Sequence, residues 1–371
     1  MPTRMSRRSV LQAAGSVALV PSAAGAAEIP GPRVEGPNTP KICLEAGAGG
    51  LSAGGYDEAG MRRVKQLGVN YVLTGGPKIP WQEAEVRDRM AKFKAGGITL
   101  YNMMIGGFPK TIYGKPGRDQ EIDAVCQSLR AAGAAGLAVV EYNFYAHRAM
   151  EGYYEVPGRA GAGYTGFDYS RMQDLPPLPE EGAHNLDEMW SNITYFLKAV
   201  IPVAEKAGVR MALHPNDPPA PLSRGSQQIM GTVAGWKKLI GIVNSPSNGI
   251  TFDCGVTREM GENPVEVCRY FASRDRINHV HFRNVRVDKP YEKYAEVFID
   301  EGQVDMFAVM KELIRNKYTR TIYPEHPRAI DYDREHPGFR HTYPGGGGYA
   351  AFAFNVGFAK AMQQAALESL G

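Results

Sequence analysis

The sequence predicts an α/β protein built as a single (β/α)8 barrel. Short apolar, β-branched runs alternate with longer stretches in which apolar residues recur at spacings of three and four. These are the patterns of buried strands and of amphipathic helices. Eight runs and eight stretches are present, which is the number that closes a barrel, and 371 residues suffice for one such domain.

The predicted strands are, in chain order, KICLEA at 41–46, VNYVLT at 69–74, ITLYNMM at 98–104, LAVVEYNF at 137–144, VRMALH at 209–214, GITFDC at 249–254, INHVHFR at 277–283 and RTIYPE at 320–325. The predicted helices are 57–67, 82–95, 119–133, 185–207, 228–243, 264–273, 303–316 and 349–368. The rival arrangement is a doubly wound open sheet, which carries a glycine-rich phosphate fingerprint after its first strand. The stretch EAGAGGLSAGG at 45–55 lacks a G-x-G-x-x-G that enters a helix, and this favours the TIM barrel.

The first 27 residues predict an export signal. SRRSVLQ contains the pair Arg7 and Arg8 and fits a twin-arginine pattern; a weakly apolar stretch at 13–20 and the small residues Ala24-Gly25-Ala26 follow. The apolar stretch is far shorter than the ~20 residues that span a bilayer. We therefore expect no membrane anchor, a periplasmic location and a mature catalytic domain at 28–371, with a disordered basic tail as the alternative.

Composition argues against nucleic acid as a partner. The formal net charge is +3 and the basic residues are scattered beyond the N-terminus, whereas nucleic-acid-binding domains concentrate them. The four cysteines are Cys43, Cys126, Cys254 and Cys268. Their spacing is not that of a small disulfide scaffold, so we expect no structural disulfide.

One long interval, residues 145–184, interrupts the alternation after the fourth strand. It is rich in Tyr, Gly and Pro. Long loops inside compact domains are commonly functional, so we expect an active-site lid. An oligomer contact or a floppy insertion is the alternative.

Four residues with metal-ligand chemistry end the last four predicted strands: His214, Cys254, His281 and Glu325. Functional groups of a (β/α)8 barrel lie at the C-terminal ends of its strands, where the loops meet. Two imidazoles, a thiolate and a carboxylate there predict one divalent metal site, compatible with zinc, iron(II), manganese or cobalt. His279 lies on the same strand face as His281; we choose His281 because it is nearer the strand's C-terminal end.

Polar residues around these four suggest a pocket for a polyhydroxy acid. Arg suits bidentate carboxylate binding, and the other groups bind hydroxyls or carry protons. The set comprises Tyr142 and Asn143, Asn216 and Asp217, Arg258 and Glu259, Arg283 and Asn284, and His326 and Arg328.

The second half of the chain resembles the mannonate dehydratase family. The resemblance rests on a long helical stretch ending in HPNDPP at 214–219, followed by SPSNGITFDCG, HVHFRN, GQVDM, YPEH and HPGF. It is strong over 185–370 and weak over 41–145. It implies a barrel lyase that uses manganese or a similar divalent ion and removes water from a sugar acid to give a 2-keto-3-deoxy acid. It also implies that His214, Cys254, His281 and Glu325 are the ligands, with Fe²⁺, Co²⁺ and Zn²⁺ as alternatives to Mn²⁺.

The chain departs from the family pattern at several places. Glu325 stands where the family has Asp, and Gly75-Gly76 replace paired histidines after the second strand. The family's E-A-A-H becomes Glu296-Val297-Phe298-Ile299, and Tyr323 and Phe339 replace an Arg and a Tyr. Tyr343, His341 and His336 are the groups available as substitutes.

We expect Arg283 to bind the substrate carboxylate, and Asp217, His326 and Tyr343 to carry protons. Asn216, Arg258, Asn284 and Tyr142 are the expected substrate-binding residues. The alternatives are a metal-dependent isomerase or epimerase, or a β-eliminating enzyme on a keto-sugar, in the xylose-isomerase-like superfamily; a non-enzymatic sugar-binding protein leaves the metal residues unexplained. Homo-oligomerisation is compatible with the sequence.

Overall fold

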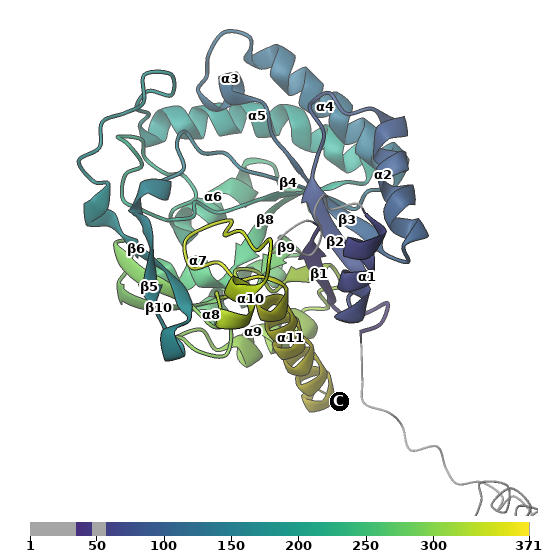
Figure 1. The fold of residues 1–371 in the computed structure, drawn as a ribbon. Helices are drawn as coiled ribbons and strands as arrows, with labels where there is room; N and C mark the ends of the chain where they lie inside the picture. The colour runs from purple at the N-terminus through teal and green to yellow at the C-terminus, as the bar shows by residue number, and fades with distance from the viewer. Residues whose placement is uncertain (1–34, 47–56, 371) are drawn as a thin grey trace, which may run out of the picture. The chain divides into compact units, whose positions relative to one another are not determined.

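The computed structural model describes residues 35–46 and 57–370, and all of them fall within one compact unit. Eight parallel strands close a barrel in the order β1-β12-β9-β8-β7-β4-β3-β2 (Figure 1). Their bounds are β1 Lys41–Glu45, β2 Tyr71–Gly75, β3 Thr99–Ile105, β4 Val139–Tyr142, β7 Arg210–Leu213, β8 Asn248–Asp253, β9 Ile277–His281 and β12 Thr321–Tyr323. Each lies within a predicted strand or extends it by one residue, which confirms the (β/α)8 barrel. The predicted export signal at 1–27 and most of the glycine-rich stretch at 45–55 lie outside the described residues.

Helices follow the strands and cover the outside of the barrel. They are α1 Glu58–Gln66, α2 Glu83–Ala95, α4 Arg118–Ala135, α5 Leu186–Ala207, α6 Val233–Ile242, α8 Pro264–Ala272, α9 Met306–Arg315 and α11 Tyr349–Ser369. Shorter helices are α3 Pro109–Ile112, α7 Cys254–Glu259 and α10 Asp331–Glu335. Within the described ranges, none of the helices has the length and apolar character needed to cross a membrane.

Local capping sets where the helices begin. Asn185 and Glu188 form a capping box at the start of α5, which satisfies amide groups that have no partner inside the helix. Helix α6 begins at Val233, five residues later than predicted, because the Thr232 side chain accepts a hydrogen bond from the amide of Gly235 and so caps the helix there.

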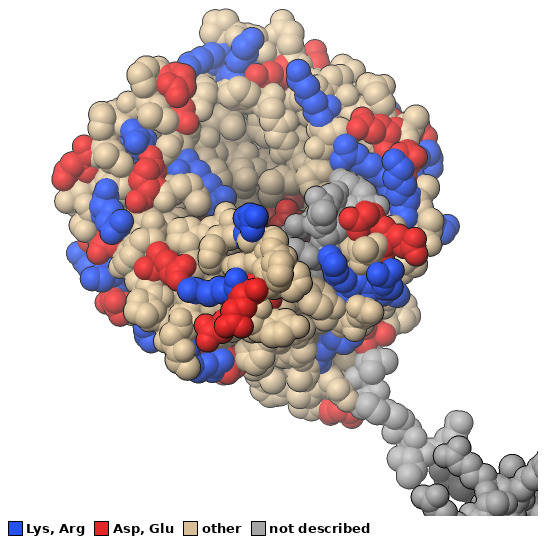
Figure 2. All heavy atoms as spheres, viewed as in Figure 1, with Lys and Arg blue, Asp and Glu red and all other residues tan. Residues whose placement is uncertain are grey.

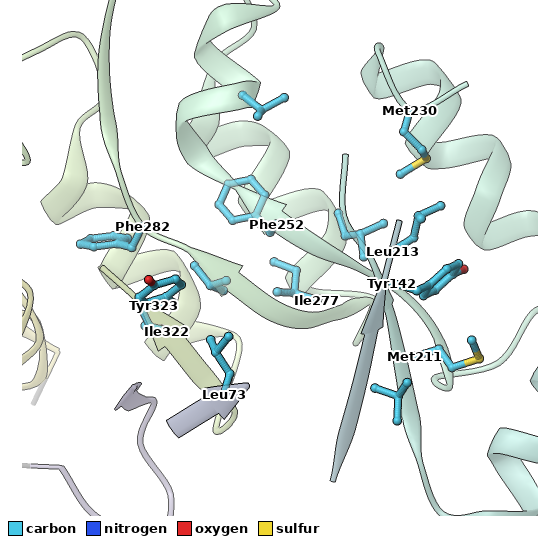
Figure 3. Packing of buried hydrophobic residues seen from close by; sticks show 14 of the residues in the cluster. Leu73, Tyr142, Met211, Leu213, Met230, Phe252, Ile277, Phe282, Ile322 and Tyr323 are labelled. Atoms are coloured by element: carbon cyan, nitrogen blue, oxygen red, sulfur yellow. The ribbon is translucent and has the colours of Figure 1, made fainter. Parts of the chain in front are cut away.

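An apolar layer lies between the strands and the helices. The stacked rings of Phe108 and Phe196 belong to it, and Figure 3 shows the part that contains Leu213, Met230 and Phe252. Such burial stabilises by roughly 25 cal/mol per Å² of apolar surface. This packed layer therefore holds the strands, and with them the residues at the strand ends, in fixed positions.

The lumen of the barrel contains a buried polar network. Glu141 of β4 accepts hydrogen bonds from Asn102 of β3 (2.9 Å) and from Thr251 of β8 (2.8 Å). His279 of β9 bonds Thr321 of β12 at 2.9 Å. Buried polar groups need such partners, and this network leads upward to the strand ends.

A second, four-stranded antiparallel sheet was not predicted. Its order is β10-β11-β6-β5, with bounds β5 Tyr153–Pro157, β6 Gly163–Asp168, β10 Asn284–Lys289 and β11 Lys293–Val297. Residues 145–184 therefore contain a β-hairpin, and its strand β6 pairs with β11 from the segment after β9. All four cysteines are unpaired and buried.

Candidate metal centre and pocket

A pocket of about 270 Å³ opens at the C-terminal ends of the barrel strands. Its wall includes His214, His281, Glu325 and His326, from the ends of β7, β9 and β12. The face seen in Figure 2 is hollowed, and positive and negative side chains are interspersed around the hollow. The volume approaches the lower end of the range for small-molecule pockets, ~300 Å³.

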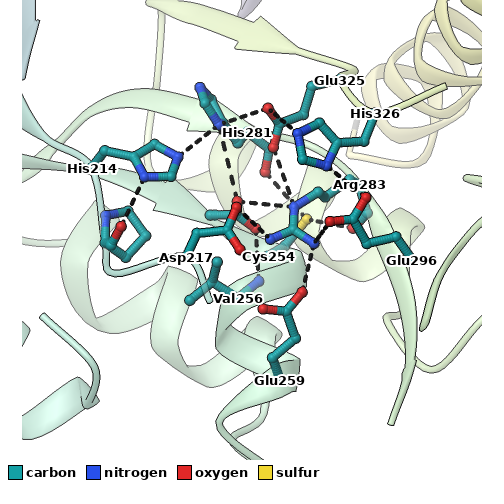
Figure 4. A network of polar contacts seen from close by, with 12 residues as sticks. His214, Asp217, Cys254, Val256, Glu259, His281, Arg283, Glu296, Glu325 and His326 are labelled. Atoms are coloured by element: carbon teal, nitrogen blue, oxygen red, sulfur yellow. Dashed lines mark hydrogen bonds and ion pairs between the residues drawn. The ribbon is translucent and has the colours of Figure 1, made fainter. Parts of the chain in front are cut away.

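His214, His281 and Glu325 form a chain of contacts through His281. Nε2 of His214 lies 3.1 Å from Nδ1 of His281, and the same Nδ1 lies 3.0 Å from Oε2 of Glu325 (Figure 4). All three side chains are buried. Strand-end positions thus bring three of the four predicted ligands together.

The surroundings of His214 fix which of its nitrogens faces His281. The Tyr145 hydroxyl donates to the carbonyl of Pro215 (2.9 Å) and lies 3.0 Å from Nδ1 of His214, which is itself 2.8 Å from that carbonyl. A carbonyl only accepts, so Nδ1 carries the proton. Nε2 is therefore left with its lone pair towards His281, as a metal-binding imidazole requires.

Each of the two distances from Nδ1 of His281, taken as a pair, matches the separation of neighbouring ligand atoms around a divalent ion. Two atoms that each lie ~2.1 Å from one ion, 90° apart, are ~3.0 Å from each other. A tight group around the same point, with ligand atoms within 4.8 Å of one another, consists of His214, Asp253 and His281. The chain therefore offers two imidazoles and the carboxylate of Asp253 at one place. Glu325 contacts this group through His281 but, among the described residues, is in none of the groups of three or more ligand atoms.

Cys254 lies beside this group without joining it. Its Sγ lies 3.4 Å from the carbonyl of His281 and 3.2 Å from that of Arg283. Burial raises the pKa of the thiol well above its usual range. Among the described residues, Cys254 is in none of the groups of three or more ligand atoms that lie within 4.8 Å.

His281 carries a proton in the absence of an ion. Burial opposes its charge, but Glu325, which bonds it, together with Glu141 and Asp253 raises its pKa to about 9. Nε2 of His281 lies 3.5 Å from Oε1 of Glu141. Since neighbouring carboxylates favour positive charge, the centre attracts a cation.

Arg283 lies at the middle of the acidic cluster and not on the pocket wall. It is 2% exposed and faces five carboxylates (Figure 4). The distances are 2.6 Å to Glu259, 3.1 Å to Asp253, 3.2 Å to Glu325, and 3.5 Å to Asp217 and to Glu296. Its guanidinium thus neutralises charges of the protein itself.

His326 does line the pocket. Its Nδ1 lies 2.7 Å from Oε2 of Glu296 and its Nε2 lies 3.5 Å from Oε2 of Glu325. Burial opposes the charged form, but these two carboxylates raise the pKa of His326. Tyr343 packs against the His326 ring at 4.8 Å, while its hydroxyl faces Arg328 and the carbonyl of Pro327.

Asp217 is the second of the predicted proton carriers on the pocket wall. Burial would raise its pKa, but Arg283, Arg148 and two histidines lower it to about 2. Its Oδ1 accepts a hydrogen bond of 2.7 Å from the hydroxyl of Tyr153. Asp217 is therefore ionised at neutral pH and weakly basic.

The four expected substrate-binding residues lie elsewhere. Asn216 accepts from the amide of Met230, and Asn284 bonds the backbone of Ile299 and Val304. Arg258 donates to Gln303. Tyr142 is fully buried against Phe196, among the side chains of Figure 3. These side chains shape the loops and the core.

Several residues of the site were not singled out from the sequence: Glu141, Asp253, Tyr145, Arg148, Tyr153 and Glu296. Asp253 directly precedes Cys254 at the end of β8, and the choice of the thiol as the ligand passed over this carboxylate. Glu296 belongs to the second sheet, in the segment that departs from the family pattern. Glu141 precedes the strand end, so the strand-end rule passed over it.

Two departures from the family pattern shape the pocket wall. Gly75 lines the pocket, and a Cβ added there would meet none of the described residues within 4 Å, at a position where the family has a histidine. At Gly76 a Cβ would lie 2.2 Å from Trp81. Tyr323 lines the pocket edge-on to His281, with ring centroids 5.6 Å apart.

Known proteins match this chain over most of its length. The profile of the D-mannonate dehydratase (UxuA) family matches residues 159–366. A mannonate dehydratase of Thermotoga petrophila is 32% identical over 325 residues, which cover 76% of this chain and 89% of the relative. The crystal structure of mannonate dehydratase from Streptococcus suis serotype 2 superposes with a TM-score of 0.78 at 25% identity and covers 90% of this chain and 96% of that one. The 3-keto-D-glucoside 4-epimerase of E. coli, with a TM-score of 0.52 at 15% identity over 87% of this chain and 100% of that one, shares the fold alone.

Proposed function

The chain belongs to the D-mannonate dehydratase family, and from this premise we propose that it is a hydro-lyase that removes water from a sugar acid. The product would be a 2-keto-3-deoxy acid. The observation that carries the proposal is the contact chain of His214, His281 and Glu325 on the wall of the pocket at the barrel mouth.

The family is metal-dependent, and we propose Mn²⁺ as the ion of this centre. His214, His281 and Asp253 would hold it. Glu325, which contacts His281, and Cys254 are proposed as further ligands from the family resemblance. When bound, such an ion acts as a Lewis acid that acidifies the C–H next to a carboxylate.

His326 is the residue that we propose as proton donor to the departing hydroxyl. Its Nδ1 is held by Glu296, so Nε2 is the atom at which the proton is delivered. The two carboxylates raise the pKa of the imidazole and so favour its protonated form, which suits a general acid. The ion pair of Asp217 with Arg283, 3.5 Å long, holds in place the charge of Asp217, which lines the same pocket as His326.

The second sheet is hydrogen-bonded to the loops beside the site, and we propose that residues 145–184 act as a lid with β10 and β11. Tyr153 of β5 bonds Asp217, and Glu296 of β11 bonds His326. Shielding from water strengthens electrostatic contacts inside a site. The hairpin is well placed to provide that shielding.

The proposed activity is tested with the mature protein loaded with Mn²⁺. It is incubated with a panel of aldonic acids, keto-sugars and 3-keto-glycosides, and 2-keto-3-deoxy acids are assayed. We expect such a product from an aldonic acid, and none from the His281→Ala variant. Lys92→Ala, which alters an exposed ion pair with Asp88, is the matched control and should keep full activity.

Two results would contradict the proposal. Isomers formed without loss of water would identify an isomerase or epimerase, and binding without any turnover would identify a binding protein. Cys254→Ala is expected to lower the stoichiometry of bound metal; full retention would remove the thiol from the ligand set.

A further inference from the structure

Arg148 is the cation that the pocket presents to a ligand. It follows β4 in the segment that leads to the second sheet, and its side chain is 44% exposed. Among the described residues that line the pocket, it is the only Lys or Arg. The other ionisable side chains that line the pocket are four carboxylates (Glu45, Glu141, Asp217 and Glu325), three histidines and two tyrosines.

The contacts of Arg148 hold its guanidinium in place without using up its donors. Nε donates to the backbone carbonyl of Asp217 at 3.1 Å. Nη2 lies 3.8 Å from Oδ2 of Asp217, which is too long for a hydrogen bond. Within the part of the chain that the structure describes, neither terminal nitrogen donates a hydrogen bond, so both remain available.

The other arginine near the site cannot serve in this role. Arg283 faces five carboxylates, is buried, and lies off the pocket wall. To bind a substrate carboxylate it would have to leave one of these partners, which would then be buried and unpaired at a cost of several kcal/mol. Arg148 lies 3.8 Å from its carboxylate neighbour Asp217, so it could bind a ligand without breaking a buried hydrogen-bonded ion pair.

The positions of Arg148 and His326 around the barrel define how a bound ligand would lie in the pocket. Arg148 follows β4, whereas Glu325 and His326 follow β12, and these two strands lie four places apart in the eight-stranded barrel. They are therefore on opposite sides of the mouth. A ligand held by Arg148 at one end would extend across the His214–His281 pair towards His326.

We propose that Arg148 binds the carboxylate of the sugar acid and so gives the pocket its preference for acids over neutral polyols. The inference rests on the proposed function. A guanidinium and a carboxylate form two parallel hydrogen bonds. Four carboxylates line the same pocket, so loss of Arg148 would leave a bound carboxylate with more like charge around it.

The test compares an aldonic acid with its alditol, for example mannonate with mannitol, in calorimetric titrations of the Mn²⁺-loaded protein. We expect the wild type to bind the acid more tightly. Arg148→Gln should reduce that preference ~10- to 100-fold, the range of a charge-assisted hydrogen bond, and leave the affinity for the alditol unchanged. The acid preference of Arg148→Lys should fall between those of the wild type and Arg148→Gln, because Lys keeps the charge but cannot form the two parallel hydrogen bonds of a guanidinium.

The control is Arg171→Gln, an exposed arginine of the same 145–184 segment that stacks on Tyr154. It should bind both ligands like the wild type. Melting temperature and metal content of each variant show that the fold and the centre are intact. Arg148→Gln that keeps the full preference would overturn the inference, as would a wild type without any preference.

The two proposals fail separately. An acid preference that depends on Arg148, without formation of a 2-keto-3-deoxy acid, contradicts the dehydratase activity and supports the carboxylate site. Turnover of the acid with an unchanged KM in Arg148→Gln supports the activity and contradicts the site.

Discussion

Replacement of Arg283 by Met tests whether one buried cation holds the acidic cluster together. The substitution keeps the length of the side chain and removes its charge. Five carboxylates lie within 3.5 Å of the guanidinium. Removing one partner of a buried ion pair typically destabilises a protein by ~3–5 kcal/mol, a large part of the ~5–15 kcal/mol by which domains are stable.

The shift at Asp217 supports this magnitude. Its pKa falls from 3.8 to about 2, and ~1.4 kcal/mol per unit makes this ~2–3 kcal/mol of stability at neutral pH. Burial works against that shift, and Arg283 is the largest of the effects that produce it. Without Arg283, burial acts on Asp217 with less opposition, so the loss includes both the missing attraction and the desolvation of the carboxylate.

The loss should depend on pH with a definite sign. In Arg283→Met, burial raises the folded-state pKa of Asp217 and of Glu259 relative to the unfolded chain. When the pKa of a group is higher in the folded than in the unfolded state, its contribution to the free energy of unfolding is fully present below the unfolded-state pKa. That contribution is lost as the pH rises through the folded-state pKa. The variant should therefore be less impaired at pH 5 than at pH 8.

Urea unfolding of the metal-free protein, followed by circular dichroism at pH 5 and pH 8, measures both effects. Arg87→Met is the matched control, since Arg87 makes an exposed ion pair of 2.7 Å with Glu83 and such pairs contribute ~0–1 kcal/mol. A loss at pH 8 no larger than that of the control, or a loss that is equal at both pH values, would refute the assigned role of Arg283.

Three further predictions concern the metal centre and export. Glu141→Gln should weaken Mn²⁺ binding ~10- to 100-fold, as loss of a carboxylate behind a metal-binding histidine does; titration calorimetry measures this, and equal affinity would remove Glu141 from the centre. Because a proton on His281, whose pKa is about 9, competes with the ion, the apparent affinity should rise ~10-fold per pH unit up to that pH; a flat profile between pH 6 and 8 would show that this proton is absent. Joint replacement of Arg7 and Arg8 by Lys should retain the unprocessed protein in the cytoplasm, as cell fractionation shows, if the N-terminus is a twin-arginine signal; export that continues unchanged would reject it.

The barrel was predictable because each of its strands carries a strong local signal. A parallel strand covered on both faces reads as a continuous apolar run, as in RMAL of β7 and ITF within β8. The second sheet lacks that signal. Its strands β6 and β11 lie more than 120 residues apart in the chain, and runs such as YYEVP and KYAEV are short and partly exposed. Only their pairing in space identifies them.

The candidate site, like the fold, was predictable only in part. The strand-end rule located His214, His281 and Glu325, because backbone direction alone places such residues at the mouth. It did not separate side chains that face the pocket from those that hold its walls. Asn216 and Asn284, for example, bond neighbouring backbone groups, and such bonds depend on loop conformations that the order of residues does not reveal.

The second sheet links the loops on either side of the site. Tyr153 of β5 bonds Asp217 in the loop after β7, while Glu296 of β11 bonds both His326 and Arg328 after β12. Strands β5 and β11 are joined through β6, so the two loops are attached to one rigid element. A displacement of this sheet would therefore move Glu296 and Tyr153 together, and would alter the proton position on His326 and the hydrogen bonding of Asp217 at the same time. The departure of this chain from its family at residues 296–299 thus falls on the element that couples the two halves of the pocket.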